Sequence, residues 1–325
     1  MYATYYERNG SAREVLRFGE IDTPAPGEGE VRVRLRASGV NPSDVKARQG
    51  TIRKIAFPRV VPQSDGAGVV DAVGEGVPSS RIGERVWTWN GQWKRPFGTG
   101  AQYVVLPAFQ AVPLPDPISF EIGACLGIPA LTARHAIALS GIGQRSHVLI
   151  SGGAGAVSHY AIQFAKLRGA TVITTVSSDL KAKLVREAGA DHVIDYKRES
   201  VGERVAQTTG RSGVDSIIEM DLTANAKLIP AVIRQHGNVI VYGTGAEANI
   251  PAGLCLINGI TFKFFLIYEI AKGERDAAIH EITDLLTQGR LVHNVATTFA
   301  LEDSVAAHEA VESGKISGNV VLKIE

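Results

Sequence analysis

The chain has 325 residues, 45% of them hydrophobic, and its 34 basic and 33 acidic residues leave a formal net charge of +1. This balance, with no basic block, argues against a nucleic-acid surface, and no apolar run approaches the ~18–20 residues of a membrane span. The N-terminal segment lacks the apolar core of a signal peptide. We therefore expect a soluble cytoplasmic protein, long enough for two domains.

The N-terminal part of the chain is rich in proline and glycine and carries short alternating segments. The clearest are Val31–Arg36, where valine and leucine alternate with arginine, and the runs Gly66–Gly74 and Arg85–Trp89. A period of two is typical of strands that are buried on one face. These segments predict a β-rich domain shaped as a compact, partly open antiparallel barrel.

Residues 147–243 change character, because short apolar runs alternate there with helical patterns. One helix is predicted with Asp179 as its cap and Gly189 as its end, and another over Thr223–Gln235. The predicted strands are 147–150, 171–176, 193–194, 216–218 and 239–242. This alternation predicts a doubly wound, Rossmann-type parallel sheet with helices on both faces.

A strongly apolar run, Ile260–Tyr268, follows this segment. An edge strand that apolar is a liability unless it is paired, so we expect it to join a partner subunit. An amphipathic helix and the terminal strand Val320–Ile324 complete the chain; the apolar positions predicted for the helix are Ala277, Ile282, Leu285 and Leu286.

The two cysteines, Cys125 and Cys255, are far apart in the sequence, and both stand among apolar residues. Cysteines in such surroundings are usually buried free thiols. Their scarcity fits a reducing compartment.

The segment Ser151–Ser158, SGGAGAVS, lies between the first predicted strand and a predicted helix. Gly153 and Gly155 begin a G-x-G-x-x pattern, and Ser158 stands where a third glycine is expected. Such a loop places a pyrophosphate against the free N–H groups and the partial positive charge of a helix N-terminus. The third glycine serves helix packing rather than the phosphate, so a dinucleotide site is predicted despite the serine.

The second strand of the predicted sheet ends without the carboxylate that usually binds the ribose 2′-hydroxyl of NAD. The strand runs into Ser177 and Ser178, and Asp179 fits better as a helix cap. Lys181 stands one helical turn further on, where its ammonium can pair with a 2′-phosphate, and Tyr196 follows the third strand. This pattern favours NADPH as the cofactor.

Several segments together resemble the medium-chain dehydrogenases/reductases, most of all the zeta-crystallin-type NADPH:quinone oxidoreductases. They occur in the family's order over nearly the whole chain: Ser38–Asp44, Ser64–Val70, Val73–Gly76, Gly83–Val86, Gly127–Pro129, Thr132–Ala133, the Ser151–Ser158 loop, Ile217–Met220 and Gly237–Gly243. The resemblance implies an α/β protein with a Rossmann cofactor domain and a β-rich, GroES-like catalytic domain. Residues 1–123 and 266–325 would form the catalytic domain, and 124–265 the NADPH-binding domain. A homodimer or a tetramer, paired through the cofactor-domain edge, is also implied.

The zinc-dependent alcohol dehydrogenases of the same superfamily are the nearest competitor. They carry a cysteine where this chain has Asn41, and a histidine–glutamate pair where it has Ser64 and Asp65. Two remote cysteines cannot assemble a soft tetrahedral site near Asn41. No metal site is therefore predicted, and alcohol oxidation is disfavoured because no Lewis acid would polarise the oxygen.

The resemblance assigns catalytic positions to Asn41, as a hydrogen-bond donor to a developing enolate oxygen, and to Asp44, in a structural or orienting role. Cofactor-binding positions are expected at Thr132, Gly152, Gly153, Ala154, Gly155, Ala156, Val157, Ser177, Lys181, Tyr196, Gly243 and Asn319.

The acceptor stays open between a quinone and an enone or haloacrylate-type compound. Quinone reductases of this group often have tyrosines shortly after the asparagine, where this chain has Lys46 and Ile52. The aromatic residues that can replace them are Trp87, Trp89, Trp93 and Tyr103. A different class, an NADPH-binding crystallin or RNA-binding protein, is the remaining alternative, although no basic–aromatic surface supports RNA as a partner.

Overall fold

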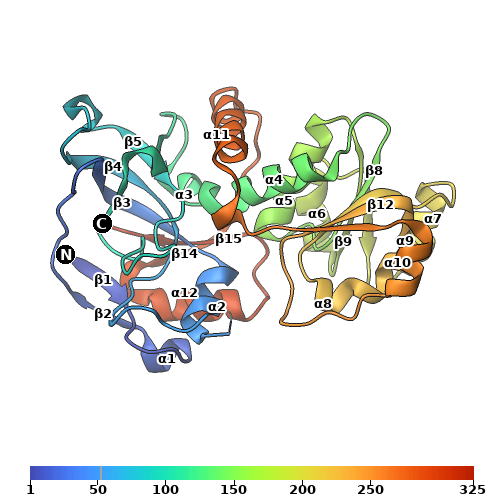
Figure 1. Ribbon diagram of the computed structural model, residues 1–325, viewed down its shortest axis with the longest axis horizontal. Helices are drawn as coiled ribbons and strands as arrows, with labels where there is room; N and C mark the ends of the chain where they lie inside the picture. Colours follow the sequence, from blue (N-terminus) through green and yellow to red (C-terminus); the bar gives the residue numbers. More distant parts are fainter. Residues whose placement is uncertain (52) are drawn as a thin grey trace. The chain divides into compact units, whose positions relative to one another are not determined.

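The computed structural model describes residues 1–51 and 53–325 (Figure 1). The chain divides into two compact units, which we call the terminal unit, Met1–Pro129 with Glu281–Glu325, and the central unit, Ala130–His280. The predicted domain limits, 1–123, 124–265 and 266–325, stay predictions. In the described part of the chain, no helix is long and apolar enough to cross a membrane.

The terminal unit is built on a seven-stranded sheet. Its path is β14-β15-β3-β4-β5-β7, and β6 pairs with β3. The strands of the unit are β1 (Tyr2–Tyr5), β2 (Arg17–Glu20), β3 (Glu30–Val40), β4 (Asp65–Val73), β5 (Arg85–Thr88), β6 (Tyr103–Pro107), β7 (Ala111–Pro113), β14 (Val295–Ala300) and β15 (Asn319–Lys323). Its helices are α1 (Ala12–Val15), α2 (Pro42–Gln49), α3 (Phe120–Gly123) and α12 (Ser304–Glu312), with a π-helical turn at Leu126–Ala130.

Strand β3 confirms the predicted alternation. Val31, Val33 and Leu35 are buried in one core, whereas the arginines between them are not buried. The sheet strands of the N-terminal part, β3 to β7, pair antiparallel as predicted, whereas β14 and β15 of the C-terminal part run parallel. The reason is the connection, because α12 lies between these two strands in the chain and carries it back to the starting edge.

The central unit contains one six-stranded, fully parallel sheet with the order β10-β9-β8-β11-β12-β13. This is the doubly wound order in which the first strand lies in the middle. The strands are β8 (His147–Ile150), β9 (Thr171–Val176), β10 (His192–Asp195), β11 (Val214–Glu219), β12 (Ile233–Val241) and β13 (Thr261–Phe264). The five predicted strands and the predicted apolar edge are confirmed.

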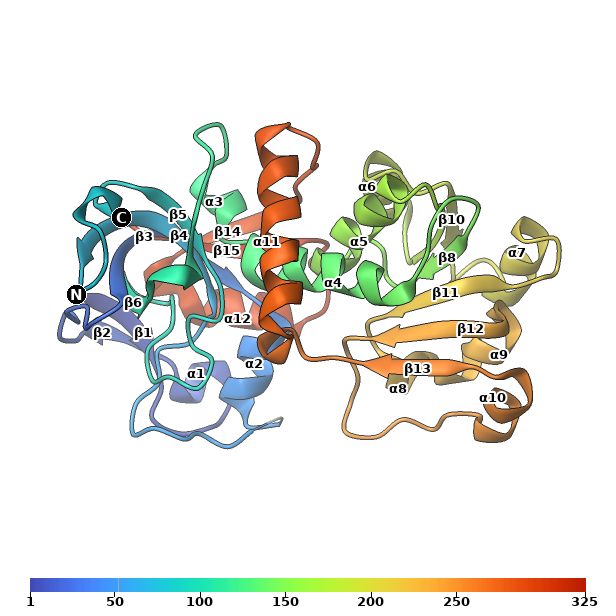
Figure 2. The same ribbon diagram turned by 45° about the horizontal axis from the view of Figure 1, so that its top comes forward.

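Helices cover both faces of this sheet (Figure 2). Leu149 packs into a core with residues of α7, α8 and α9, so its neighbours Val148 and Ile150 point to the opposite face. The helices are α4 (Leu131–Ser140), α5 (Ala156–Leu167), α6 (Asp179–Glu187), α7 (Val201–Thr208), α8 (Leu222–Asn225), α9 (Ile229–Val232) and α10 (Ala252–Asn258). Helix α11 (Lys272–Thr287) begins in the central unit and ends in the terminal unit.

Three predicted helix details were wrong. The helix expected over Thr223–Gln235 is broken into α8, a 3₁₀ turn and α9, and β12 already begins at Ile233; Pro230 lacks an N–H and restarts the helix at α9. Ser178, not Asp179, caps α6, because its hydroxyl accepts the N–H of Lys181. In α11, the predicted core position Ala277 is exposed. Ala278 is buried instead, together with Ile282, which lies one helical turn after Ala278.

Candidate functional site

The loop between β8 and α5 is built from glycines that the fold uses for different purposes. Gly152 has a φ of +59°, a left-handed conformation that favours glycine. A Cβ on Gly153 would lie less than 3.0 Å from Thr174 Oγ1 of β9, so this glycine allows close packing on the sheet. Gly155 is the N-cap of α5, and a Cβ there would meet only the carbonyl oxygen of Gly152, at 3.3 Å. Among the described residues, and apart from the chain neighbours of Gly155, no other atom lies within 4 Å of this Cβ position at the N-terminus of α5.

Ser158, at the position of the expected third glycine, is buried and hydrogen-bonded. Its hydroxyl donates to the carbonyl of Ser151 at 2.8 Å and lies 3.0 Å from the hydroxyl of Tyr242. Burial raises the pKa of Tyr242, so this phenol stays protonated over the physiological range. The serine thus links the first turn of α5 to the end of β12 without opening the loop.

The residues that follow β9 and β10 lie next to each other. The N–H of Tyr196 donates to the carbonyl of Val176 at 3.1 Å, and the side chain of Tyr196 is 53% exposed. Within the described residues, the ammonium of half-buried Lys181 has no ion-pair partner. Ser177, which directly follows Val176 at the end of β9, is half-buried.

Arg198, which sequence reasoning missed, changes the electrostatics beside Lys181. Its guanidinium lies 3.1 Å from the carboxylate of Asp179. The one carboxylate close to the β9 tip in sequence is therefore neutralised by an arginine. Arg198 follows the third predicted strand by a few residues, and its basic character beside Tyr196 was the available signal.

Two further predicted cofactor positions, Thr132 and Gly243, are buried or closely packed in the central unit. The hydroxyl of Thr132, on α4, is buried and has no hydrogen-bond partner among the described residues. A Cβ on Gly243 would lie less than 3.0 Å from the carbonyl oxygen of Met220, so only glycine allows β11 and β12 to end this close together. Asn319 belongs to the terminal unit, where its side-chain amide donates to the carbonyl of Asn294 at 3.0 Å.

In the terminal unit, Asn41 precedes α2 and is held at its main chain by Asp44. The N–H of Asn41 donates to Asp44 Oδ2 at 2.8 Å, and Pro42 occupies the first turn, where its missing N–H costs nothing. Burial raises the pKa of Asp44 to about 7, against the lowering effect of the Asn41 N–H and of Arg53. Asn41 and Asp44 are both buried.

The side chain of Asn41 is held by Asp65, the second residue that sequence reasoning missed. Asn41 Nδ2 donates to Asp65 Oδ2 at 2.9 Å, and the N–H of Ile128 donates to the same oxygen at 3.0 Å. Burial and the nearby charge of Asp44 raise the pKa of Asp65 well above its ordinary value. Asp65 stands in the Ser64–Val70 segment that carries the family resemblance, so the signal was present and was used only to test for zinc.

The aromatic residues proposed to replace the missing tyrosines have different surroundings. Trp87 is completely buried and belongs to the core. Trp93 carries the guanidinium of Arg53 at 4.9 Å from its ring centroid, and Tyr103 carries that of Arg32 at 5.2 Å. Lys46 is half-buried on α2. Ile52 lies outside the described residues.

Zinc does not fit the residues at Asn41, Ser64 and Asp65. The amide of Asn41 and the carboxyl group of Asp65 are hydrogen-bonded to each other. The nearby thiol of Cys125 is buried, and burial and the charge of Asp65 raise its pKa well above the ordinary value. Among the described residues, no group of three His, Cys, Asp or Glu side chains is arranged to hold a metal ion. Both cysteines are free and buried, as predicted.

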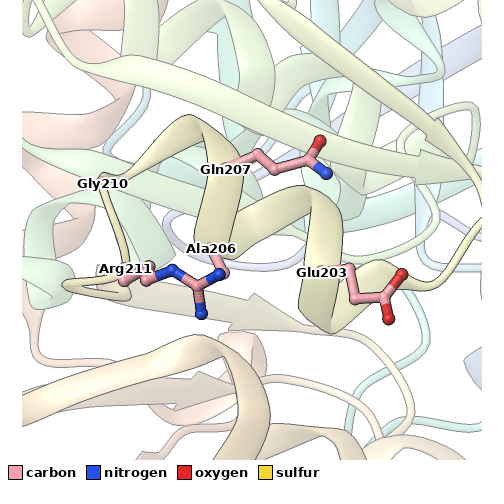
Figure 3. A pocket seen from close by; sticks show the side chains of 5 residues that line it. All are labelled: Glu203, Ala206, Gln207, Gly210 and Arg211. Atoms are coloured by element: carbon pink, nitrogen blue, oxygen red, sulfur yellow. The ribbon is translucent and has the colours of Figure 1, made fainter.

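A separate hollow lies beside α7 (Figure 3). It is lined by Glu203, Ala206, Gln207, Gly210 and Arg211. None of the predicted site residues lines it. Its lining residues belong to α7 and to the turn that follows this helix.

Comparison with known proteins places both units in one superfamily. The family described as "Alcohol dehydrogenase GroES-like domain" matches residues 27–116, and "Zinc-binding dehydrogenase" matches residues 156–285. The chain is 29% identical to a rat quinone oxidoreductase, over 95% of this chain and 94% of the relative. It is 28% identical to a 2-haloacrylate reductase of a Burkholderia species, over 99% and 98%.

The solved structures agree with these matches. The Escherichia coli quinone oxidoreductase complexed with NADPH is 26% identical, with a TM-score of 0.90 over 100% of both chains. A structure described as an NAD-dependent alcohol dehydrogenase is 28% identical, with a TM-score of 0.91 over 100% of both chains. The chain belongs to the medium-chain dehydrogenase/reductase superfamily.

Proposed function

We propose that this protein is a zinc-independent, NADPH-dependent reductase that transfers hydride to a quinone or to an α,β-unsaturated carbonyl compound. The observation that carries the proposal is the open N-terminus of α5 behind Gly155, in a chain that has a hydrogen-bonded asparagine where zinc enzymes have a cysteine. Full-length similarity to quinone oxidoreductases and to a 2-haloacrylate reductase supports this reaction class.

The central unit has the features that a dinucleotide phosphate requires. The first N–H groups of α5 point out of the helix end and would bind the pyrophosphate. The unpaired ammonium of Lys181 would bind the 2′-phosphate, beside Ser177 and Tyr196. The buried, unpartnered hydroxyl of Thr132 is a further donor for the bound cofactor. Similarity to a quinone oxidoreductase solved with NADPH supports this cofactor.

The bound cofactor supplies a hydride from its nicotinamide ring. The chain's own contribution is then positioning and charge stabilisation. One N–H of the Asn41 amide donates to Asp65, and the other would donate to the acceptor oxygen as negative charge develops on it. Asp44 holds the main chain of Asn41 at the start of α2, so the donor is preorganised.

The acceptor needs no Lewis acid, because a conjugated carbonyl is already electrophilic. An alcohol substrate would need its oxygen polarised by a metal, and the residues at Asn41 and Asp65 do not fit one. The proposed activity is therefore reduction of a conjugated acceptor rather than alcohol oxidation.

We also propose that two chains pair through β13 in a cytoplasmic homodimer. The edge strand leaves Phe264 exposed, and Leu266 follows it. On α10, Leu256 and Ile257 are 83% and 79% exposed. Covering such an apolar edge with a second copy removes it from water. Light scattering on the purified protein, with Phe264→Lys as the disrupted variant, tests the pairing.

Steady-state kinetics test the reaction. We expect oxidation of NADPH, in preference to NADH, with 1,2- or 1,4-quinones, with simple enones or with 2-haloacrylates. A chelator should leave the activity intact, and elemental analysis should find less than one zinc per chain. Tight NADPH binding without turnover of any acceptor would instead favour a nucleotide-binding or RNA-binding protein.

A further inference from the structure

The amide of Asn41 is fixed by a contact that the proposed chemistry does not use. Asp65 Oδ2 accepts two hydrogen bonds, from Asn41 Nδ2 at 2.9 Å and from the N–H of Ile128 at 3.0 Å. Two donors converge on this oxygen, so it acts as an acceptor whether or not the other carboxyl oxygen is protonated. The amide nitrogen of Asn41, rather than its oxygen, therefore faces Asp65.

Asp65 itself is closed off from any ligand. Its side chain is completely buried, and Oδ1 has no hydrogen-bond partner among the described residues. A Cβ on Gly127 would lie less than 3.0 Å from Oδ1, which shows how closely the Gly127 main chain covers this atom. An atom covered in this way cannot pass a proton directly to a substrate.

The orientation of the amide has a chemical consequence. A free asparagine side chain can rotate by 180° about its last bond and present either its oxygen or its nitrogen. Only the nitrogen can stabilise a developing oxyanion, whereas the oxygen would repel it. With one N–H bound to Asp65, the same nitrogen carries a second N–H, and the Asn41 side chain also lies within hydrogen-bonding reach of Asp44.

We propose that Asp65 is a positioning residue that holds the Asn41 amide in its donor orientation, so that the second N–H of Asn41 meets the acceptor oxygen. The proposal rests on the proposed function. Asp65 acts through Asn41 and does not touch the substrate. The contact therefore requires a hydrogen-bond acceptor at Asp65, not a negative charge.

Two substitutions of Asp65 separate the need for a hydrogen-bond acceptor from the need for a negative charge. Asp65→Asn keeps an oxygen that can accept from Asn41 and Ile128, so we expect its kcat to stay within about threefold of the wild-type value. Asp65→Leu keeps the branched shape, with larger end groups, but has no acceptor, and we expect its kcat to fall about 10- to 100-fold, with the KM for NADPH unchanged. In an Asn41→Ala background, Asp65→Leu should change kcat less than about twofold further.

Thr99→Val is the matched control for the fold. The hydroxyl of Thr99 donates to the main-chain carbonyl of Asp65 at 2.7 Å, so its loss disturbs the same residue without touching the carboxyl group. We expect lower stability and an unchanged kcat. Full activity of Asp65→Leu, or an equal further loss in the Asn41→Ala background, would overturn the proposal.

A measurement on the wild-type protein tests the contact without depending on activity. We expect the side-chain amide protons of Asn41, assigned by ¹⁵N NMR with Asn41→Ala, to exchange with water at least tenfold more slowly than those of the exposed residue Asn249. Equally fast exchange would contradict the contact itself. If exchange is slow but no acceptor is turned over, the proposed function fails while the contact stands.

Discussion

The two units hold their polar sites in different ways. The loop of the central unit is contiguous, Ser151–Gly155, and leads into the first N–H groups of α5, which have no partner within the helix. Most of the loop's own N–H groups are already hydrogen-bonded within the unit. The cluster of the terminal unit is assembled from three separate segments: the side chains of Asn41 and Asp65 and the main-chain N–H of Ile128. The loop depends on glycines, which have no side chain. The Asn41–Asp65 cluster depends on polar groups from distant segments that come into contact.

This difference predicts different responses to substitution. A main-chain site is sensitive to added atoms and insensitive to the loss of a side chain. A buried side-chain cluster is sensitive to any lost donor or acceptor, because a buried polar atom without a partner is costly. The following experiments test that contrast, from the largest expected effect to the smallest.

Asn41→Ala should lower kcat by about 10²- to 10³-fold, because a donor aimed at developing charge is lost. The dissociation constant for NADPH should not change. Asn41→Ser is the control for helix capping, since serine also caps helices but lacks the amide, and it should be as inactive as alanine. Stopped-flow and steady-state rates measure the effect, and a kcat within threefold of wild type would remove Asn41 from the mechanism.

Lys181→Ala should weaken NADPH binding by about 10- to 150-fold, the equivalent of roughly 1.5–3 kcal/mol for a charge-assisted hydrogen bond. Binding of NADH should not change. Lys183→Ala is the matched control, because Lys183 lies on the same helix and its ammonium is 3.9 Å from Glu187 instead. Calorimetry measures the dissociation constant for NADPH. An unchanged value would show that Lys181 is only a surface cation on α6 and does not bind the 2′-phosphate.

Gly153→Ala and Gly155→Ala should divide the loop into its two roles. A methyl group at Gly153 would meet Thr174, whose hydroxyl already donates to the Ile150 carbonyl at 2.7 Å, so we expect a loss of about 1–3 kcal/mol in the free energy of unfolding. Gly155→Ala should fold normally and bind NADPH less well. Denaturant unfolding and calorimetry on both variants test this, and the reverse pattern would refute the assignment.

Asp44→Asn should remove a pH dependence of stability. Because burial raises the folded-state pKa of Asp44 from 3.8 to about 7, its stabilising contribution is complete below the unfolded pKa and is lost as the pH rises through about 7. The slope approaches about 1.4 kcal/mol per pH unit inside this window. Urea unfolding between pH 5 and 7 should therefore show a falling free energy of unfolding for the wild type relative to Asp44→Asn, and parallel curves would contradict the raised pKa.

Ser158→Ala should have the smallest effect, about 1 kcal/mol in the free energy of unfolding, through the lost hydrogen bonds to Ser151 and Tyr242. Tyr242→Phe removes the other partner. A double-mutant cycle should give a measurable coupling between the two substitutions. Strict additivity would show that the serine merely fills the space of the expected glycine.

Much of the central unit was predictable from sequence, since its five strands, its apolar edge and its glycine loop depend on local patterns. Parallel strands that are buried on both faces are continuous apolar runs, and the loop lies directly between one such run and a helix. The errors came where local signals compete. Ser178 and Asp179 are both good caps, and Pro230 can begin a helix as well as end one.

The Asn41–Asp65 cluster shows where local patterns stop being informative. The sequence by itself determined the superfamily fold and the glycine loop between β8 and α5, because each depends on neighbouring residues or on a motif. Only the tertiary structure decided that Asp65 meets Asn41, that Arg198 neutralises Asp179 and that Ser158 bonds Tyr242. Those partners are 24, 19 and 84 residues apart in the chain, and no periodicity links residues that meet only when strands and loops pack together.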